Sequence, residues 1–218
     1  MLTWYLTRAA GAAALVLLTG SVMLGIADVQ RWTTRSVPRF LVDGLHRTVS
    51  LLAVAMLAVH ILTTVIDGFA PITLTDAVIP FGSAYRPVWL GLGALAFDLL
   101  LAVTITSVLR ARIGVRVWRA THWAAYACWP LALVHGLGTG SDVQAGWMLW
   151  LSLACTAGVT VAVLVRTAGA AKRGSGVLAA VTAGVLALVI GLAVWLPGGP
   201  LASGWAEKAG TPTSLLQK

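Results

Sequence analysis

Histidine is the residue type in this sequence whose number and spacing best suit chemistry, because a neutral imidazole is a common metal ligand. The 218-residue chain contains only four of them, at His46, His60, His122 and His135. The first two are 14 positions apart, at the ends of "HRTVSLLAVAMLAVH", and the last two are 13 apart. Each pair lies in or at the edge of an apolar segment. An imidazole in such a segment is costly without a partner, so a functional role is expected.

The two spacings have different consequences on a helix. At about 1.5 Å per residue, each pair is separated by about 20 Å along the axis. Fourteen steps leave His46 and His60 on one face, whereas 13 steps turn His135 about 140° away from the face of His122. Pro130 lies between the last two histidines, in "CWPLALVH". We expect this proline to distort its helix and bring His135 round to the face of His122.

Six apolar segments carry or surround these residues, at 9–27, 42–66, 88–109, 120–137, 146–165 and 176–196. Each is close to the roughly 20 residues that a membrane-spanning helix needs. The chain is 59% hydrophobic and 10% charged, whereas a soluble domain is about 25% charged. The predicted fold is therefore an all-α, polytopic membrane bundle of six transmembrane helices. The net charge of +8 does not indicate nucleic-acid binding, because the basic residues lie in short loops.

Loop charges predict the orientation of these segments. Eleven of the 15 Lys and Arg residues follow the first, third and fifth segments: Arg31, Arg35, Arg39, Arg47, Arg110, Arg112, Arg116, Arg119, Arg166, Lys172 and Arg173. The positive-inside rule places these three loops in the cytoplasm and both termini outside. The first segment is then predicted to be an uncleaved membrane anchor. We expect a multi-pass protein of the cell membrane, specifically the bacterial plasma membrane.

This topology pairs the histidines by depth. The second and fourth segments both start at the cytoplasmic side, so His46 and His122 share the inner depth and His60 and His135 the outer depth. Two imidazoles from facing helices suit a six-coordinate haem with one histidine on each side of the iron. A zinc or copper ion would need further protein ligands nearby, whereas a porphyrin supplies four nitrogens. The expected cofactors are two haems b, with the four histidines as ligands of the haem iron.

Four charged residues are candidates for roles beside the haems. Haem propionates favour arginine partners, which predicts Arg47 and Arg119 for the inner haem and Arg86 for the outer one. Anchoring at the membrane surface is the alternative for these arginines. Asp98 lies near the middle of the third segment, where an ionised carboxylate costs about 2.5–3.5 kcal/mol on insertion scales. It is predicted to bond a ligand histidine or to relay protons, and a neutral acid bonded to a nearby hydroxyl or carbonyl is the plainer alternative.

Several segments resemble the ferric reductase-like transmembrane domain, whose superfamily includes NADPH oxidases, iron reductases and the haem subunit of the bacterial methionine sulfoxide reductase system. They are "VPRF", "LHRTVSLLAVAMLAVH", "YRPVWLGLGALAFDLLLAVTITSVLR" and "VWRATHWAAYACWPLALVHGLGTGSD". Ser107-x-x-Arg110 and Trp118-Arg119-x-x-His122 stand where family members carry similar residues. The resemblance implies that the four histidines are axial haem ligands. It predicts four parts: a first helix and cytoplasmic loop at 1–39, a di-haem core of four helices at 40–165, a cytoplasmic loop and sixth helix at 166–197, and an extracytoplasmic tail at 198–218.

The predicted function is that of a transmembrane b-type cytochrome, an oxidoreductase component with no catalytic residue assigned. No GxGxxG appears in a strand–turn–helix setting, so we expect a separate donor, either a cytoplasmic flavoprotein or membrane quinol. The preferred acceptor is an extracytoplasmic protein that carries a flavin, with ferric iron or oxygen as alternatives.

Two other functional classes stay open. A transporter or proton relay could use the intramembrane histidines and Asp98, and it predicts a colourless protein. A structural or assembly subunit predicts that replacing the histidines is harmless. The Gly- and Pro-rich tail from residue 198 is expected to be extended and without fixed structure.

Overall fold

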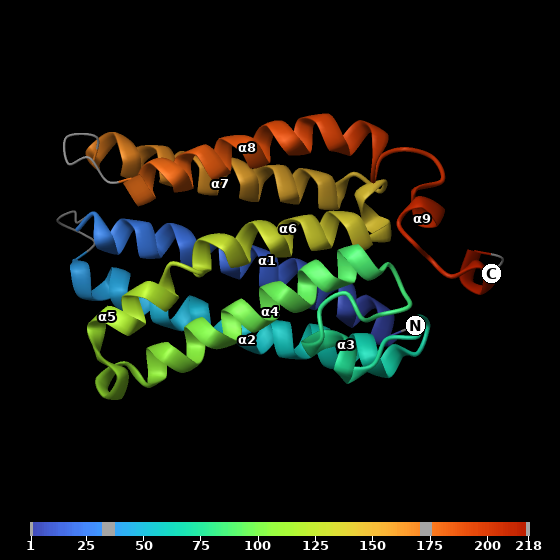
Figure 1. Cartoon of the computed structure of the whole chain (residues 1–218), viewed down its shortest axis with the longest axis horizontal. Coiled ribbons are helices and arrows are strands. Elements are labelled where there is room, and N and C mark those ends of the chain that lie inside the picture. Colours follow the sequence, from blue (N-terminus) through green and yellow to red (C-terminus); the bar gives the residue numbers. More distant parts are fainter. Residues whose placement is uncertain (1, 32–37, 171–175, 217–218) are drawn as a thin grey trace.

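The computed structural model describes residues 2–31, 38–170 and 176–216, and all regular elements in these ranges are helices (Figure 1). The basic residues Arg35, Lys172 and Arg173 lie outside the described ranges. The α-helices are α1 Leu2–Val29, α2 Arg39–Asp67, α3 Leu74–Val78, α4 Pro87–Val108, α5 Arg110–His122, α6 Ala125–Thr139, α7 Trp147–Ala170, α8 Gly176–Gly198, α9 Trp205–Lys208 and α10 Thr213–Leu216. A short 3₁₀ turn, η1, spans Ser141–Val143.

Five of the described helices are long and apolar enough to cross a membrane: α1, α2, α4, α7 and α8. They carry large apolar side chains on their outward faces, such as Leu52, Ile105 and Ile190. Exposed apolar surface on this scale is unfavourable in water and suits a lipid environment. The chain is therefore a multi-pass membrane protein, and the prediction is confirmed for these five spans.

The fourth predicted segment, 120–137, is not one continuous helix. Its residues are shared between the end of α5 and most of α6, with a break at Trp123 and Ala124. Helix α6 has 15 residues, or about 22 Å, which is less than a hydrocarbon core of about 30 Å. It lies between the longer helices (Figure 1), where Leu133 and Leu137 are 0% and 1% exposed.

The irregularity between His122 and His135 differs from the one predicted. Helix α6 continues through Pro130 without a break, and the irregular residues lie earlier, at Trp123 and Ala124. The chain instead winds tightly at the break. The short-range bonds there run from Ala124 N to Thr121 O, from Tyr126 N to Trp123 O and from Ala127 N to Ala124 O. Where the chain winds at three residues per turn, each residue advances about 120° around the axis instead of about 100°. The extra rotation reduces the angle around the helix axis between the faces that carry His122 and His135.

A contact from α7 holds this break in place. Arg166 donates a hydrogen bond to the hydroxyl of Tyr126, and its guanidinium carbon lies 5.1 Å from the ring centre of Trp123. The rings of Trp123 and Tyr126 are stacked, with centroids 5.3 Å apart. The break is thus stabilised by a residue 40 positions further along the chain.

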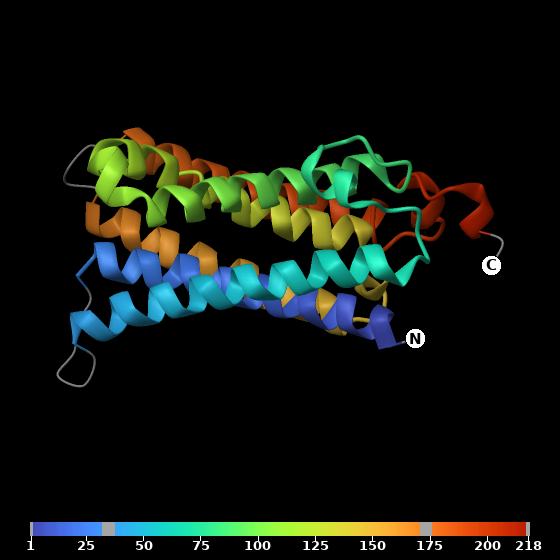
Figure 2. The same cartoon turned by 90° about the horizontal axis from the view of Figure 1, so that it is seen from below.

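Helices α1 and α2 run antiparallel and side by side along their length (Figures 1 and 2). Hydroxyl groups link them, from Thr7 to Thr63 at 2.9 Å and between Ser21 and Ser50 at 2.7 Å. Small polar residues of this kind allow close helix packing and bond across it in a membrane. Helix α1 was predicted to lie outside the four-helix core, yet it accompanies the helix that carries His46 and His60.

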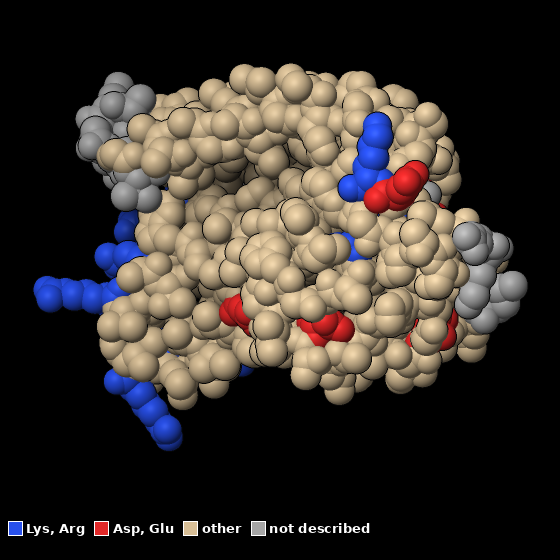
Figure 3. All heavy atoms as spheres, turned by 45° about the vertical axis from the view of Figure 1, so that its right-hand side comes forward, with Lys and Arg blue, Asp and Glu red and all other residues tan. Residues whose placement is uncertain are grey.

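The two ends of the bundle differ in charge. One end is here called the basic end. Helices α1 and α7 end there, helices α2 and α8 begin there, and α5 is located there. The other end, here called the terminal end, holds both chain termini (Figure 1). Figure 3 shows several Lys and Arg side chains projecting from the basic end, while the Asp and Glu side chains visible in this view are spread over the rest of the molecule.

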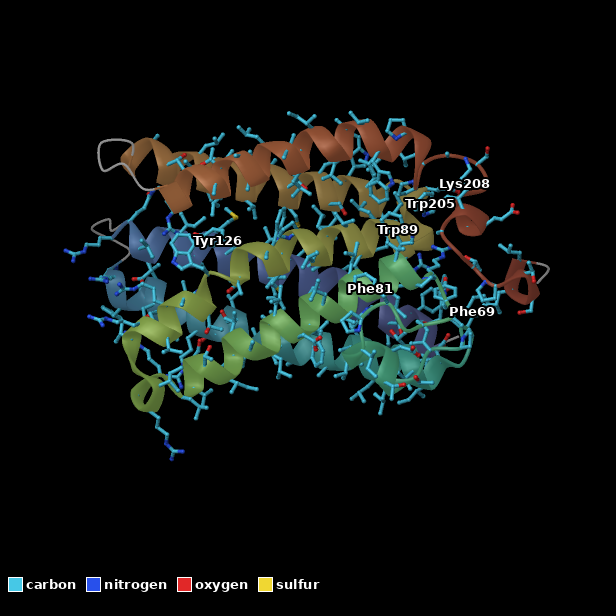
Figure 4. All side chains as sticks on the ribbon, viewed as in Figure 1. Phe69, Phe81, Trp89, Tyr126, Trp205 and Lys208 are labelled. Carbon is cyan, nitrogen blue, oxygen red and sulfur yellow. The ribbon has the colours of Figure 1, made fainter. Side chains whose placement is uncertain are left out.

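The C-terminal tail is folded against the terminal end, which corrects the expectation of an extended segment. Trp205 of α9 donates from Nε1 to the carbonyl of Gly138 at 3.1 Å. Its ring centroid lies 5.2 Å from that of Trp89 and 5.7 Å from that of Trp195. Figure 4 shows Trp205 beside Trp89 at the end of the bundle. Aromatic packing therefore gives the tail a fixed position.

Candidate functional site

The four histidines form two pairs of facing rings. The ring centroids of His46 and His122 are 6.3 Å apart, and those of His60 and His135 are also 6.3 Å apart. Helix α2 supplies one ring of each pair, while the other comes from the last residue of α5 or from α6. The ring planes cross at 73° in the first pair and at 83° in the second.

This separation suits two imidazoles on opposite sides of one metal ion. With a metal–nitrogen bond of about 2.0 Å and a ring nitrogen about 1.1 Å from its ring centre, the two centroids would lie about 6.2 Å apart. The described residues contain no group of three or more His, Cys, Asp or Glu that could hold a bare ion. A metal held by either pair would need its other ligands from outside these residues, and a macrocycle is one source that supplies them.

Backbone carbonyl groups orient three of the four rings. Nδ1 donates to Ser21 O at 2.9 Å in His46, to Thr7 O at 2.8 Å in His60, and to Trp89 O at 2.9 Å in His135. A carbonyl oxygen can only accept, so Nδ1 must carry the hydrogen in each case. The tautomer leaves the lone pair of Nε2 available for a metal, and the bond raises the basicity of the ring.

His122 is held differently. Its buried Nδ1 has no hydrogen-bond partner among the described residues. Its ring packs instead against Trp118, at 5.0 Å between centroids. Trp118 donates from Nε1 to Ser107 Oγ at 3.3 Å. The guanidinium carbon of Arg110 lies over the ring of Trp118, 4.2 Å from the ring centre. Ser107, Arg110 and Trp118, which belong to the two short motifs quoted from the sequence, therefore lie together beside His122.

A cavity of about 310 Å³ is lined by both His60 and His135, and its volume is within the range of about 300–1,000 Å³ that is usual for ligand pockets. Its wall is mainly apolar and includes Leu57, Gly93 and Phe97. It extends to residues at the terminal end of the bundle, among them Trp4, Arg8 and Tyr85. The pair nearer that end thus borders a space that reaches the surface loops.

The basic end has a separate hollow, of about 580 Å³. Its lining consists of Asp28, Arg39, Phe40, Asp43, Arg110 and Trp118. Neither His46 nor His122 lines it, although Trp118 connects the hollow to the ring of His122.

The predicted arginines have different surroundings. Arg47 and Arg119 are exposed at the basic end, on the same helices as His46 and His122, and their part in binding propionates stays a prediction. Arg86 is only 4% exposed. It does not line the cavity. Its side chain donates to Thr211 Oγ1 at 2.9 Å, Thr139 O at 2.9 Å and Gly138 O at 3.2 Å.

Arg8 is the cation that lines the same cavity as His60 and His135. It is paired with Asp142 and lies over the ring of Trp4, 3.8 Å from its centre. The sequence does not single out Arg8, because nothing in its local pattern links it to residue 142.

Asp98 is half-buried on α4 and does not line the cavity. The Nδ1 groups of His46, His60 and His135 are bonded to carbonyls. The predicted role of Asp98 as the partner of a ligand histidine is therefore not seen at these three rings.

One family model matches the chain. It is described as ferric reductase like transmembrane component, and it matches residues 10–133, which is more than half of the sequence. The match includes His46, His60 and His122 and ends two residues before His135. No curated protein and no solved structure matches the chain.

Proposed function

The chain belongs to the ferric reductase-like transmembrane family, and from this premise we propose that it is a b-type cytochrome that conducts electrons across the membrane. Its four histidines would hold two haems, an inner one between His46 and His122 and an outer one between His60 and His135. The observation that carries the proposal is the equal separation of 6.3 Å in the two pairs.

The protein's contribution is to orient the ligands and exclude water. A bound haem would supply an iron that accepts and releases one electron at a time. The carbonyls of Ser21, Thr7 and Trp89 hold Nδ1 of three histidines, so that Nε2 of each would be free to bind the haem iron. The apolar wall around His60 and His135 limits access of water and so influences the reduction potential.

The proposal includes six crossings with both termini outside. Helices α5 and α6 together would form the fourth crossing, with the basic face of α5 at the cytoplasmic surface. The charge on the basic end supports this orientation through the positive-inside rule. The inner haem then lies near the cytoplasm and the outer haem near the terminal end.

Electrons would enter at the basic end from a cytoplasmic flavoprotein or from membrane quinol. They would leave at the terminal end, where an extracytoplasmic protein carrying a flavin is the preferred acceptor and ferric iron or oxygen are the alternatives. The extension of the cavity from His60 and His135 to the terminal end supports an exit on that side.

The transporter or relay alternative has less support. It requires Asp98 to lie on a path with the histidines, and Asp98 does not line their cavity. An Asp98→Asn variant should therefore conduct electrons as the unaltered protein does.

Transport of electrons across a sealed bilayer tests the proposal. The purified protein is reconstituted into liposomes with dithionite trapped inside and ferricyanide outside, since neither anion crosses the bilayer. Ferricyanide should be reduced faster than in empty liposomes. A His60→Ala, His135→Ala double variant should lose this activity, because the outer haem would have no axial ligand.

The Asp98→Asn variant serves as the matched control, since it alters an intramembrane residue outside the cavity. Ferricyanide reduction no faster than in empty liposomes, by a protein that is folded and haem-loaded, would refute electron conduction.

A further inference from the structure

Three histidine rings rest directly on a glycine of a neighbouring helix. A Cβ atom built on Gly11 would lie 2.9 Å from Nδ1 of His60, and one on Gly25 would lie 3.2 Å from Cε1 of His46. On Gly93 it would lie 2.6 Å from Cε1 of His135 and closer still to Nδ1. No side chain fits between these rings and the helix backbone at Gly11 or Gly93, and at Gly25 the ring would have to give way slightly.

Each glycine stands four residues after the carbonyl that the same ring bonds. The pairs are Thr7 and Gly11 for His60, Ser21 and Gly25 for His46, and Trp89 and Gly93 for His135. Residues i and i+4 lie one above the other on a helix face, and the carbonyl of residue i points toward residue i+4. The missing side chain thus opens a gap through which the imidazole reaches the carbonyl. We call this arrangement a glycine seat.

The seats on α1 match the histidines on α2. Gly11 and Gly25 are 14 residues apart, as are His46 and His60. Because α1 and α2 run antiparallel, the first glycine meets the second histidine and the second glycine meets the first. Equal spacing on two helices gives both rings the same seat.

On the basis of the proposed function, we propose that Gly11, Gly25 and Gly93 are positioning residues that set the orientation and basicity of three axial imidazoles. His122 has no carbonyl partner and no such seat among the described residues. The inner haem would therefore have one seated ligand and the outer haem two. Loss of a seat would displace the ring, break its bond to the carbonyl and lower its basicity, which raises the reduction potential of that haem alone.

Close packing of helices is the ordinary reason for glycine in a membrane bundle. Gly20 provides a control for an effect of helix packing alone. It lies on α1 between the two seats, and a Cβ there would meet only Val49, at an ordinary 3.6 Å. An effect specific to the seats should be absent from Gly20→Ala.

The test uses the purified holoprotein and four variants: Gly11→Ala, Gly20→Ala, Gly25→Ala and Gly93→Ala. A potentiometric titration followed optically gives the potential of each haem, and the haem-to-protein ratio gives occupancy. His135→Ala and His46→Ala identify which titration step belongs to which haem. We expect Gly93→Ala to raise the potential of the outer haem or remove it, which halves the haem content. Gly11→Ala should affect the same haem less, and Gly25→Ala should cause a small rise in the inner haem only.

Unaltered potentials and full haem content in both Gly93→Ala and Gly25→Ala would overturn the inference, as would equal changes in both haems from every variant including Gly20→Ala. If Gly93→Ala does not accumulate, Gly25→Ala decides, because its contact is the mildest of the three. An unaltered protein without haem would instead refute the proposed function, so the two failures are distinguishable.

Discussion

Trp89 contacts His135 through its backbone carbonyl and the C-terminal tail through its ring. Its carbonyl accepts the Nδ1 hydrogen of His135 at 2.9 Å. Its ring is stacked on Trp195, with centroids 4.9 Å apart, and lies 5.2 Å from that of Trp205 (Figure 4). A residue that orients a proposed haem ligand is therefore held by the tail of the chain. Loosening the tail should therefore disturb the position of His135 at the outer haem.

Arg86 is the residue whose loss should loosen the tail most. It bonds the last carbonyls of α6 and the hydroxyl of Thr211, and its own backbone N–H donates to Gly210 O at 3.0 Å. A bond from a charged donor contributes about 1.5–3 kcal/mol, and the bonds of one guanidinium are not additive, so Arg86→Ala should destabilise the solubilised protein by about 2–4 kcal/mol. The rate at which a protease cleaves the tail and the temperature at which the protein aggregates would measure this loss of stability.

Arg86→Lys should restore only part of that loss, since an ammonium group cannot reproduce the planar fork of donors. Arg112→Ala is the matched control, because Arg112 is exposed on α5. If the Arg86→Ala and Arg112→Ala proteins have the same melting temperature, the buried guanidinium does not hold the tail.

Single-histidine variants should remove one haem at a time. His135→Ala should lose the outer haem and keep the inner one, whereas His46→Ala should do the reverse. The physical reason is that each ring has its partner at its own depth, 6.3 Å away. Haem extracted per mole of protein should fall from about two to about one in each variant. A variant that retained both haems would show that the missing histidine is not an essential ligand.

The angles between the ring planes predict the magnetic properties of the ferric protein. Imidazoles in parallel planes interact with the same iron d orbital and split the two relevant orbitals. Planes crossed at 73° and 83° act on different orbitals and leave them nearly equal in energy. Electron paramagnetic resonance of the oxidised protein should show strongly anisotropic low-spin signals. Signals of the weakly anisotropic, parallel-plane type would contradict the ring orientations described.

The orientation can be tested with introduced cysteines, because the native Cys128 and Cys155 are 1% and 6% exposed. A membrane-impermeant maleimide applied to intact cells should label Lys208→Cys at the terminal end. It should label Arg112→Cys at the basic end only after the membrane is permeabilised. The reverse pattern would place the basic end outside.

Some features could be predicted because they depend on composition and spacing. The apolar segments and the loop charges determined which histidines share a depth, and the structure brings His46 toward His122 and His60 toward His135. The location of the break before α6 could not be predicted, because Arg166 of α7 stabilises it by bonding Tyr126. The position of the tail depends in the same way on distant tryptophans, although its composition alone suggested disorder.

The part played by α1 has a signal in the sequence. The 14-residue interval between Gly11 and Gly25 equals that between His46 and His60. Periodicity of apolar residues does not reveal such a match, because it arises between two helices whose antiparallel packing has to be known first.

The most direct measurement is the optical spectrum of the purified, detergent-solubilised protein, made in cells with ample iron and haem precursor. Addition of dithionite should produce the sharp bands of a low-spin, six-coordinate b-type cytochrome, with about two haems per chain. A colourless protein that is otherwise folded would contradict the account, because the two histidine pairs would then hold no iron porphyrin.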